Sequence, residues 1–270
     1  MILLTDENLT ALHSSRQAAP PKRRGKLVLI VLAMLFWPVA ATAQNVVQSR
    51  EYGQCIELAI REPGAGFERA IAWRDLGGGA PARHCVTVAL YGLGQFHESA
   101  LRLDDLAQAN VNPELQISLL SQAGNAWLMA EEYERAHATL SAGIKLAPDH
   151  LDLLIDRSLV YAATNNYWES VEDLNRALYI DPNNADALAF RASAYRYLDN
   201  LDLAANDVNR ALSLKPDHVA AILERGIIRR LSNNLNGARK DWLHTIKLAP
   251  DSPAAEAARR NLERLDIKAE

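Results

Sequence analysis

The chain has 270 residues, of which 49% are hydrophobic and 23% charged, and this composition excludes a wholly disordered protein. The length allows one or two domains with a sizeable core. The formal net charge is −4. Beyond residue 43 the chain carries 24 basic and 31 acidic side chains, and an acidic body argues against nucleic acid as the main ligand.

Residues 1–43 have the order of a secretory signal peptide with an N-terminal extension. A basic cluster at 22–26 precedes eleven uninterrupted apolar residues, and the small residues Ala41-Thr42-Ala43 follow. The apolar run is shorter than the ~20 residues of a membrane-spanning helix. We therefore expect cleavage after Ala43 and export to the periplasm of a bacterium with two membranes. An uncleaved signal would instead anchor the chain in the inner membrane, facing the periplasm, and only then would the protein contact the membrane.

Prolines mark an internal repeat in the second half of the chain. They recur every 34 residues, and an Asp or Asn that can cap a helix follows each one. Each proline therefore ends one helix, and its successor begins the next. In frames of 34 residues, small residues align at positions 8, 20 and 27, and large residues at positions 4, 11, 17 and 24. The prolines are Pro148, Pro182, Pro216 and Pro250, and the four frames are 117–150, 151–184, 185–218 and 219–252.

The aligned positions predict a pair of antiparallel helices, A and B, in every frame. Positions 4, 8 and 11 share one face of helix A, and positions 17, 20, 24 and 27 share one face of helix B. One such pair cannot bury its apolar faces alone, so the pairs must stack. The pattern resembles the tetratricopeptide repeat family, which implies an all-α, right-handed superhelical solenoid. Arg229 stands at position 11, where this family usually has an aromatic residue, and we expect looser packing of helix A there.

The segments on either side of the repeats are also predicted to be helical. Residues 44–116 hold more glycines, and apolar periodicity predicts helices near 48–61, 66–76, 82–92 and 95–110. The last two helices form a degenerate repeat, and residues 45–79 form a hairpin that caps the stack. Residues 253–270 form a C-terminal capping helix, as the end of a solenoid requires.

Motifs that carry chemistry are few. Cys55 and Cys85 are the only cysteines, and in an exported chain we expect them to form one disulfide; two buried thiols are the alternative. A zinc site with His84 matches no known ligand spacing. Gly77-Gly78-Gly79 lacks the Lys-Ser/Thr of a phosphate loop. We find no catalytic, metal or cofactor motif, so we expect a protein without enzyme activity and without a small-molecule cofactor.

The family resemblance implies a concave groove lined by positions 2, 5, 9, 12 and 13 of the A helices. The family's carboxylate clamp needs Lys and Asn at positions 5 and 9, and only Asn125 fits it. A mixture of apolar residues and a few charges favours an amphipathic segment or the apolar surface of a partner protein. Alternatively, Ile155, Leu159, Leu223 and Ile227 merely pack against neighbouring helices. The predicted groove residues are Asn125, Met129, Ile155, Leu159, Ser193, Arg196, Tyr197, Ile227 and Arg230.

These features together predict a protein-binding scaffold or adaptor of the bacterial cell envelope, with a protein or peptide as its partner. The alternative is a membrane-anchored accessory subunit of an envelope enzyme or of a secretion or assembly machine. Retention in the membrane would distinguish the second from the first.

A ladder of charges accompanies the repeats, with Arg at position 7 and Asp at position 23. The pairs can form within one repeat or across the junction to the next. Position 7 is turned about 100° from the small residue at position 8, so we favour the cross-junction register. We expect partly buried pairs that fix the angle between repeats. The cross-junction pairs are Asp173–Arg191, Asp207–Arg225 and Asp241–Arg259, and the pairs within a repeat are Arg157–Asp173, Arg191–Asp207 and Arg225–Asp241.

Overall fold

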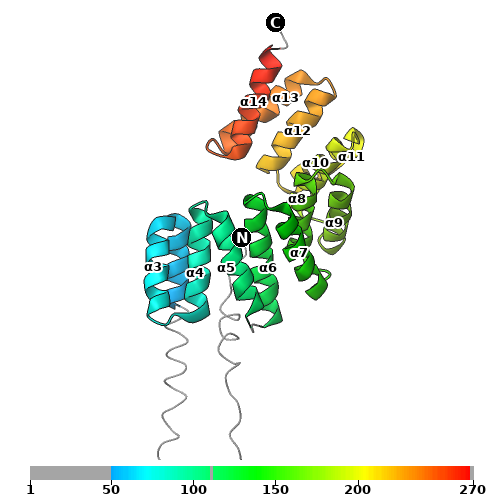
Figure 1. Ribbon diagram of the computed structural model, residues 1–270. Coiled ribbons are helices and arrows are strands. Elements are labelled where there is room, and N and C mark those ends of the chain that lie inside the picture. Colours follow the sequence, from blue (N-terminus) through cyan, green and yellow to red (C-terminus); the bar gives the residue numbers. More distant parts are fainter. Residues whose placement is uncertain (1–49, 110–111, 268–270) are drawn as a thin grey trace, which may run out of the picture. The chain divides into compact units, whose positions relative to one another are not determined.

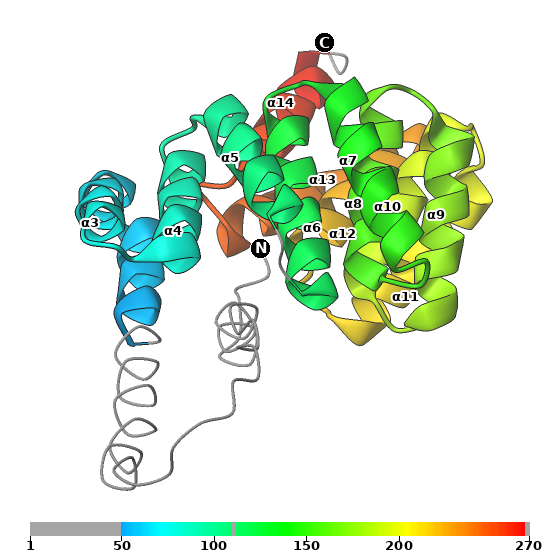
Figure 2. The same ribbon diagram turned by 60° about the horizontal axis from the view of Figure 1, so that its bottom comes forward.

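The computed structural model describes residues 50–109 and 112–267, and all regular structure in these ranges is α-helical (Figures 1 and 2). The predicted signal peptide, residues 1–43, lies outside the described residues. Of the helices in the described ranges, none has the length and apolarity that crossing a bilayer requires. The chain divides into two compact units, the first ending at Leu146 and the second beginning at Ala147. The prediction of an all-α repeat solenoid is confirmed.

The first unit is a series of helices in which each packs on its neighbour (Figure 1). The helices near its beginning lie close to the positions that apolar periodicity predicts. Helices α4 and α5 cover the predicted degenerate repeat, and α6 and α7 cover the first predicted complete one. The helices are residues 50–61, α3 (Pro63–Asp75), α4 (Gly79–Gly92), α5 (Phe96–Gln108), α6 (Pro113–Met129) and α7 (Tyr133–Leu146).

The second unit contains three helix pairs and a final helix. The final helix packs on both members of the last pair, and so occupies the place of a further helix A. Helices α10 and α12 begin one residue later than predicted: the side chains of Asn184 and His218 cap them, whereas Asn183 and Asp217, directly after the prolines, lie in the turn. The helices are α8 (Leu151–Ala163), α9 (Tyr167–Ile180), α10 (Ala185–Tyr197), α11 (Leu201–Leu214), α12 (Val219–Leu231), α13 (Leu235–Leu248) and α14 (Pro253–Ile267).

The turn between helices A and B has the same backbone structure in each repeat. Position 15 adopts the left-handed conformation, with φ between 58° and 63°. The amide of position 16 donates to the carbonyl of position 11, and the amide of position 15 to that of position 12, which is a Schellman motif. Gly94 (φ 74°) makes the same turn in the degenerate repeat. The residues at position 15 are Glu131, Asn165, Asp199 and Asn233.

The two helices of a repeat meet where position 8 of helix A touches position 24 of helix B. A Cβ atom added to Gly226 would lie 2.4 Å from the Trp242 side chain, and one added to Gly124 would lie 2.4 Å from the Leu140 side chain. Trp242 and Leu140 are fully buried. The small residue at position 8 therefore sets how closely the helices approach and fixes their register.

The pairs of the charge ladder form within the individual repeats of the second unit, so the prediction of the cross-junction register was wrong. Arg191 Nε and Nη2 each lie 2.7 Å from a carboxylate oxygen of Asp207. Arg157 forms the same bidentate ion pair with Asp173, and Arg225 forms it with Asp241.

The antiparallel arrangement of the helices explains this register. Positions 7 and 23 each precede one member of the contact between positions 8 and 24. In an antiparallel pair, a step back along either helix turns toward the same side of the contact. The Arg at position 7 and the Asp at position 23 therefore lie side by side. The cross-junction prediction was wrong because it took only the rotation of helix A into account.

The remaining ladder residues make other contacts. Arg191 Nη1 donates to Asn175 Oδ1 of the preceding helix B (2.7 Å), so the contact across this junction goes to position 25. Arg259 donates to the carbonyl of Pro250 (2.8 Å) and does not pair with Asp241. Asp241 instead accepts a second guanidinium, that of Arg229 (2.7 Å), which occupies the usual aromatic position.

A disulfide and a chain of polar side chains hold the first unit together. Cys55 and Cys85 are bonded, with a Cα–Cα distance of 6.1 Å, which confirms the predicted disulfide. The adjacent His84 is buried and accepts at Nδ1 from the Tyr52 hydroxyl (2.9 Å). Its Nε2–H donates to Gln122 Oε1 (2.8 Å), because Gln122 Nε2 faces the Ser118 carbonyl (3.4 Å). Three helices, residues 50–61, α4 and α6, are thereby linked.

Burial lowers the pKa of His84 to about 4, because the interior disfavours the imidazolium, although the bond to Gln122 works in the opposite direction. The unfolded chain protonates this residue near its ordinary pKa of 6.5. Between these two values the unfolded state binds more protons than the folded state, so stability falls as the pH is lowered.

We expect the free energy of unfolding to decrease by on the order of 3 kcal/mol between pH 6.5 and pH 4 on account of His84 alone. Urea denaturation across this pH range measures the slope. Replacing His84 with leucine should flatten the slope, whatever the variant's absolute stability. The control His244→Gln changes a side chain that is 43% exposed, and should keep the slope. An unchanged slope in His84→Leu would contradict this assignment.

The charge ladder leads to a second prediction, which concerns the stability of the protein. The side chains of Arg191 and Asp207 are only 17% and 10% exposed, so removing one of them leaves the other as a buried charge without its ion-pair partner. We expect Arg191→Met to destabilise the protein by about 2–4 kcal/mol, and the additional change Asp207→Leu to recover part of that loss. The control Arg61→Met breaks a pair with Glu57 that is about 70% exposed, and should cost less than about 1 kcal/mol. Equal losses, measured by urea denaturation, would refute a structural role for the ladder.

Candidate functional site

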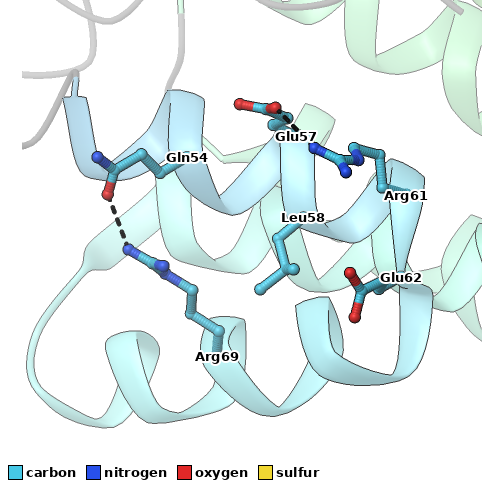
Figure 3. Close-up of a pocket in the computed structure, with 6 residues that line it drawn as sticks. All are labelled: Gln54, Glu57, Leu58, Arg61, Glu62 and Arg69. Atoms are coloured by element: carbon cyan, nitrogen blue, oxygen red, sulfur yellow. Dashed lines mark hydrogen bonds and ion pairs between the residues drawn. The ribbon is translucent and has the colours of Figure 1, made fainter.

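The candidate site is a surface on the A helices, since no chemical centre stands out elsewhere in the described residues. In the part of the chain that the structure describes, no three His, Cys, Asp or Glu side chains are grouped to hold a metal ion. A cleft of about 220 Å³ lies between helix 50–61 and α3 and is lined by Gln54, Glu57, Leu58, Arg61, Glu62 and Arg69 (Figure 3). Its arginines already bind acceptors of their own helix pair: Arg61 contacts Glu57, and Arg69 contacts Glu51 and Gln54.

The predicted groove residues of the first unit lie on α6. Met129 is 49% exposed, close to the end of the helix. Asn125 is half-buried, and its Nδ2 donates to the carbonyl of Ser121 in the same helix (3.3 Å).

The apolar groove residues of the second unit are partly buried. Ile155 and Leu159 on α8 are half-buried. Ile227 on α12 packs with Leu223 against the core around Trp242 that α14 completes. For Ile227 the alternative interpretation is therefore correct: it is a packing residue of the C-terminal cap.

Arg196 differs from the prediction because it is not a free groove residue. Its guanidinium forms a close ion pair with Glu224 of α12, and the two side chains are only 13% and 9% exposed. It also donates to the hydroxyl of Ser193, another predicted groove residue (3.2 Å). Burial raises the pKa of Glu224, and Arg196 opposes that rise by stabilising the carboxylate. Arg196 thus joins α10 to α12.

Tyr197 remains the most exposed of the groove residues in the second unit, at 56%. Its ring is parallel to that of Tyr167 on α9, with the centroids 4.5 Å apart. The Arg196 guanidinium lies 4.1 Å from the Tyr197 ring centroid, a cation–π distance. These two tyrosines and Arg196 form a surface that we call the tyrosine platform. Sequence reasoning missed Tyr167, although an aromatic at position 17 next to position 13 of the following repeat is a usable signal.

The positions that hold the two tyrosines of the platform are also exposed in the last repeat. Leu231 and Leu235 occupy positions 13 and 17 there, and are 45% and 44% exposed. Arg230, at position 12, is half-buried, and no ion pair or side-chain hydrogen bond holds it within the described ranges. The second unit therefore offers aromatic and aliphatic surface with one guanidinium beside it, which suits contact with another polypeptide.

Comparison with known proteins identifies the repeats. The sequence model of a family described as tetratricopeptide repeat matches residues 121–185 and 191–253. A search of curated proteins finds no match.

Solved structures with the same fold include a thermophilic tetratricopeptide repeat protein of Thermus thermophilus, with a TM-score of 0.59 and 17% identity over 70% of this chain and 100% of that one. MamA of Desulfovibrio magneticus RS-1 matches with a TM-score of 0.52 and 19% identity over 64% of this chain and 97% of that one. A tetratricopeptide repeat protein of Parabacteroides merdae has a TM-score of 0.52 and 19% identity over 80% and 75% of the two chains. By their repeat period, their helix pairs and the family match, residues 121–253 belong to the tetratricopeptide repeat family.

Proposed function

We propose that this protein is a scaffold or adaptor of the bacterial cell envelope that binds a segment of a partner protein on the A helices of its second unit. The observation that carries the proposal is the tyrosine platform. Tyr197 is held in place by Tyr167 and Arg196 and is still 56% exposed. A rigid aromatic side chain that loses little entropy on binding is a typical anchor of protein interfaces.

The charges around the platform support binding of apolar side chains. Arg196 and Glu224 satisfy one another, so an incoming segment does not have to pair or desolvate either of them. Ile155 and Leu159 of α8 add half-buried aliphatic surface at the groove positions of the neighbouring repeat. An apolar centre with a polar rim is the usual composition of such an interface.

Two features support location in the envelope. Residues 22–43 carry the sequence features of a secretory signal. The disulfide between Cys55 and Cys85 is fully buried, and disulfides of this structural kind persist in oxidising compartments. In the alternative, the uncleaved signal anchors the protein, which then serves as an accessory subunit of an envelope machine.

The platform can be tested by substitution of its exposed ring. We expect Tyr197→Ala to weaken capture of the partner from envelope extract by tenfold or more, because it removes the central anchor. The matched control is Tyr179→Ala on α9, a tyrosine that is 90% exposed and lies outside the groove positions. Circular dichroism should show both variants to be folded. Capture that Tyr197→Ala leaves intact and Tyr179→Ala abolishes would place the binding surface on the B helices.

Export can be tested on the protein recovered from cells. We expect the intact mass of a chain that begins at Gln44, released with the soluble periplasmic fraction. Ala43→Leu removes the small residue next to the cleavage point and should leave the precursor uncleaved. Recovery of wild-type chains that still contain residues 27–36, in the membrane fraction, would favour the anchored alternative.

A further inference from the structure

The last repeat and the capping helix have a charge of opposite sign to the rest of the protein. Residues 219–267 contain nine basic and six acidic side chains, whereas residues 50–218 contain 14 basic and 24 acidic ones. A partner segment that carries negative charge is therefore drawn to α12, α13 and α14, and repelled elsewhere.

The ion pair of Arg196 shows where a carboxylate belongs at the junction between A helices. Arg196 stands at position 12 of its repeat, and Glu224 follows 28 residues later at position 6 of the next. The same step from Arg230 leads to Ala258 on α14, which is fully buried. Because α14 packs on α12 as α12 packs on α10, Arg230 faces a junction where the corresponding carboxylate is missing.

Several other charged side chains of α12, α13 and α14 are already engaged elsewhere. On the same helix, Arg225 and Arg229 share Asp241, and Glu224 pairs with Arg196. On the adjacent helices, Arg239 pairs with Asp266, Glu256 is engaged by Arg260, and Arg259 donates to Pro250.

Arg230 itself is half-buried and directly precedes Leu231, which is 45% exposed. A guanidinium in such surroundings binds a carboxylate more strongly than one in water does.

We propose that Arg230 determines the specificity of the binding surface by pairing with an Asp or Glu side chain of the partner segment. That carboxylate takes the place at Arg230 that Glu224 takes at Arg196, and an apolar residue next to it packs on Leu231. The partner segment thus carries an acidic residue next to an apolar one. This inference rests on the proposed function, because it names the chemistry of the segment that the A helices bind.

The test uses displayed random peptides of 12 residues as the probe, selected on the 270-residue chain. Selected peptides should be enriched in an acidic residue next to an aromatic or aliphatic one. Affinity is then measured for one such peptide and for its version in which the acid is changed to the amide. On the wild-type protein the amide version should bind about tenfold more weakly or worse. Arg230→Gln should bind the acidic peptide equally weakly, and should no longer distinguish the two versions.

Arg264→Gln is the matched control. It removes an exposed arginine of α14, and thus the same net charge from the same region, and should keep both the affinity and the discrimination. Melting temperatures establish that both variants fold. Equal loss in Arg264→Gln and Arg230→Gln, or selected peptides with no acidic preference, would overturn the role of Arg230 while leaving the groove intact.

Failure of the proposed function has a different signature. Peptides whose affinity is unaffected by both Tyr197→Ala and Arg230→Gln would show that the A helices are not the binding surface. A dimer in sedimentation that Arg230→Gln dissociates would identify the occupant as a second copy of the chain, and would also overturn the proposal of an acidic partner segment.

Discussion

The close approach of position 8 on helix A to position 24 on helix B is the contact on which the rest of this structure depends. At Gly226 the approach leaves no room for even one carbon atom before Trp242, and at Gly124 none before Leu140. Once this contact is made, the helices have one register and one separation. The left-handed residue at position 15 then closes the turn with the same Schellman hydrogen bonds in each repeat. The arginines and aspartates of the ladder emerge on the same side of the contact, where they pair.

This geometry also determines which side chains are left for a partner. The ladder carboxylates Asp173, Asp207 and Asp241 are buried under arginines of their own repeats, so they stabilise the helix pairs and do not form a charged binding surface. Arg196 is likewise used internally. The large side chains that remain exposed on α10 and α12 are Tyr197 and Leu231, and the half-buried Arg230 directly precedes Leu231. In the proposed function, the partner is therefore bound through the positions that the solenoid's own packing does not use.

Periodicity made the helix pairs predictable, because a period of 34 residues with small and large positions in fixed order permits few structures. The register of the ladder was not predicted correctly. It depends on the direction in which the side chains of both helices point, and the prediction considered helix A alone. Arg196 was taken for a groove residue because its partner lies 28 residues away at a position with no constant residue type. The buried chain of Tyr52, His84 and Gln122 was missed because Tyr52 and His84 lie in a segment without a complete repeat.

The central claim is that the partner is held by the A helices of the second unit, and hydrogen exchange followed by mass spectrometry tests it most directly. The exchange of the 270-residue chain is compared with and without saturating selected peptide. Binding on the A helices predicts slower exchange in α10 and α12, around Tyr197 and Arg230, with little change in helix 50–61 and α3. Protection confined to α9 or to the cleft between helix 50–61 and α3 would contradict it.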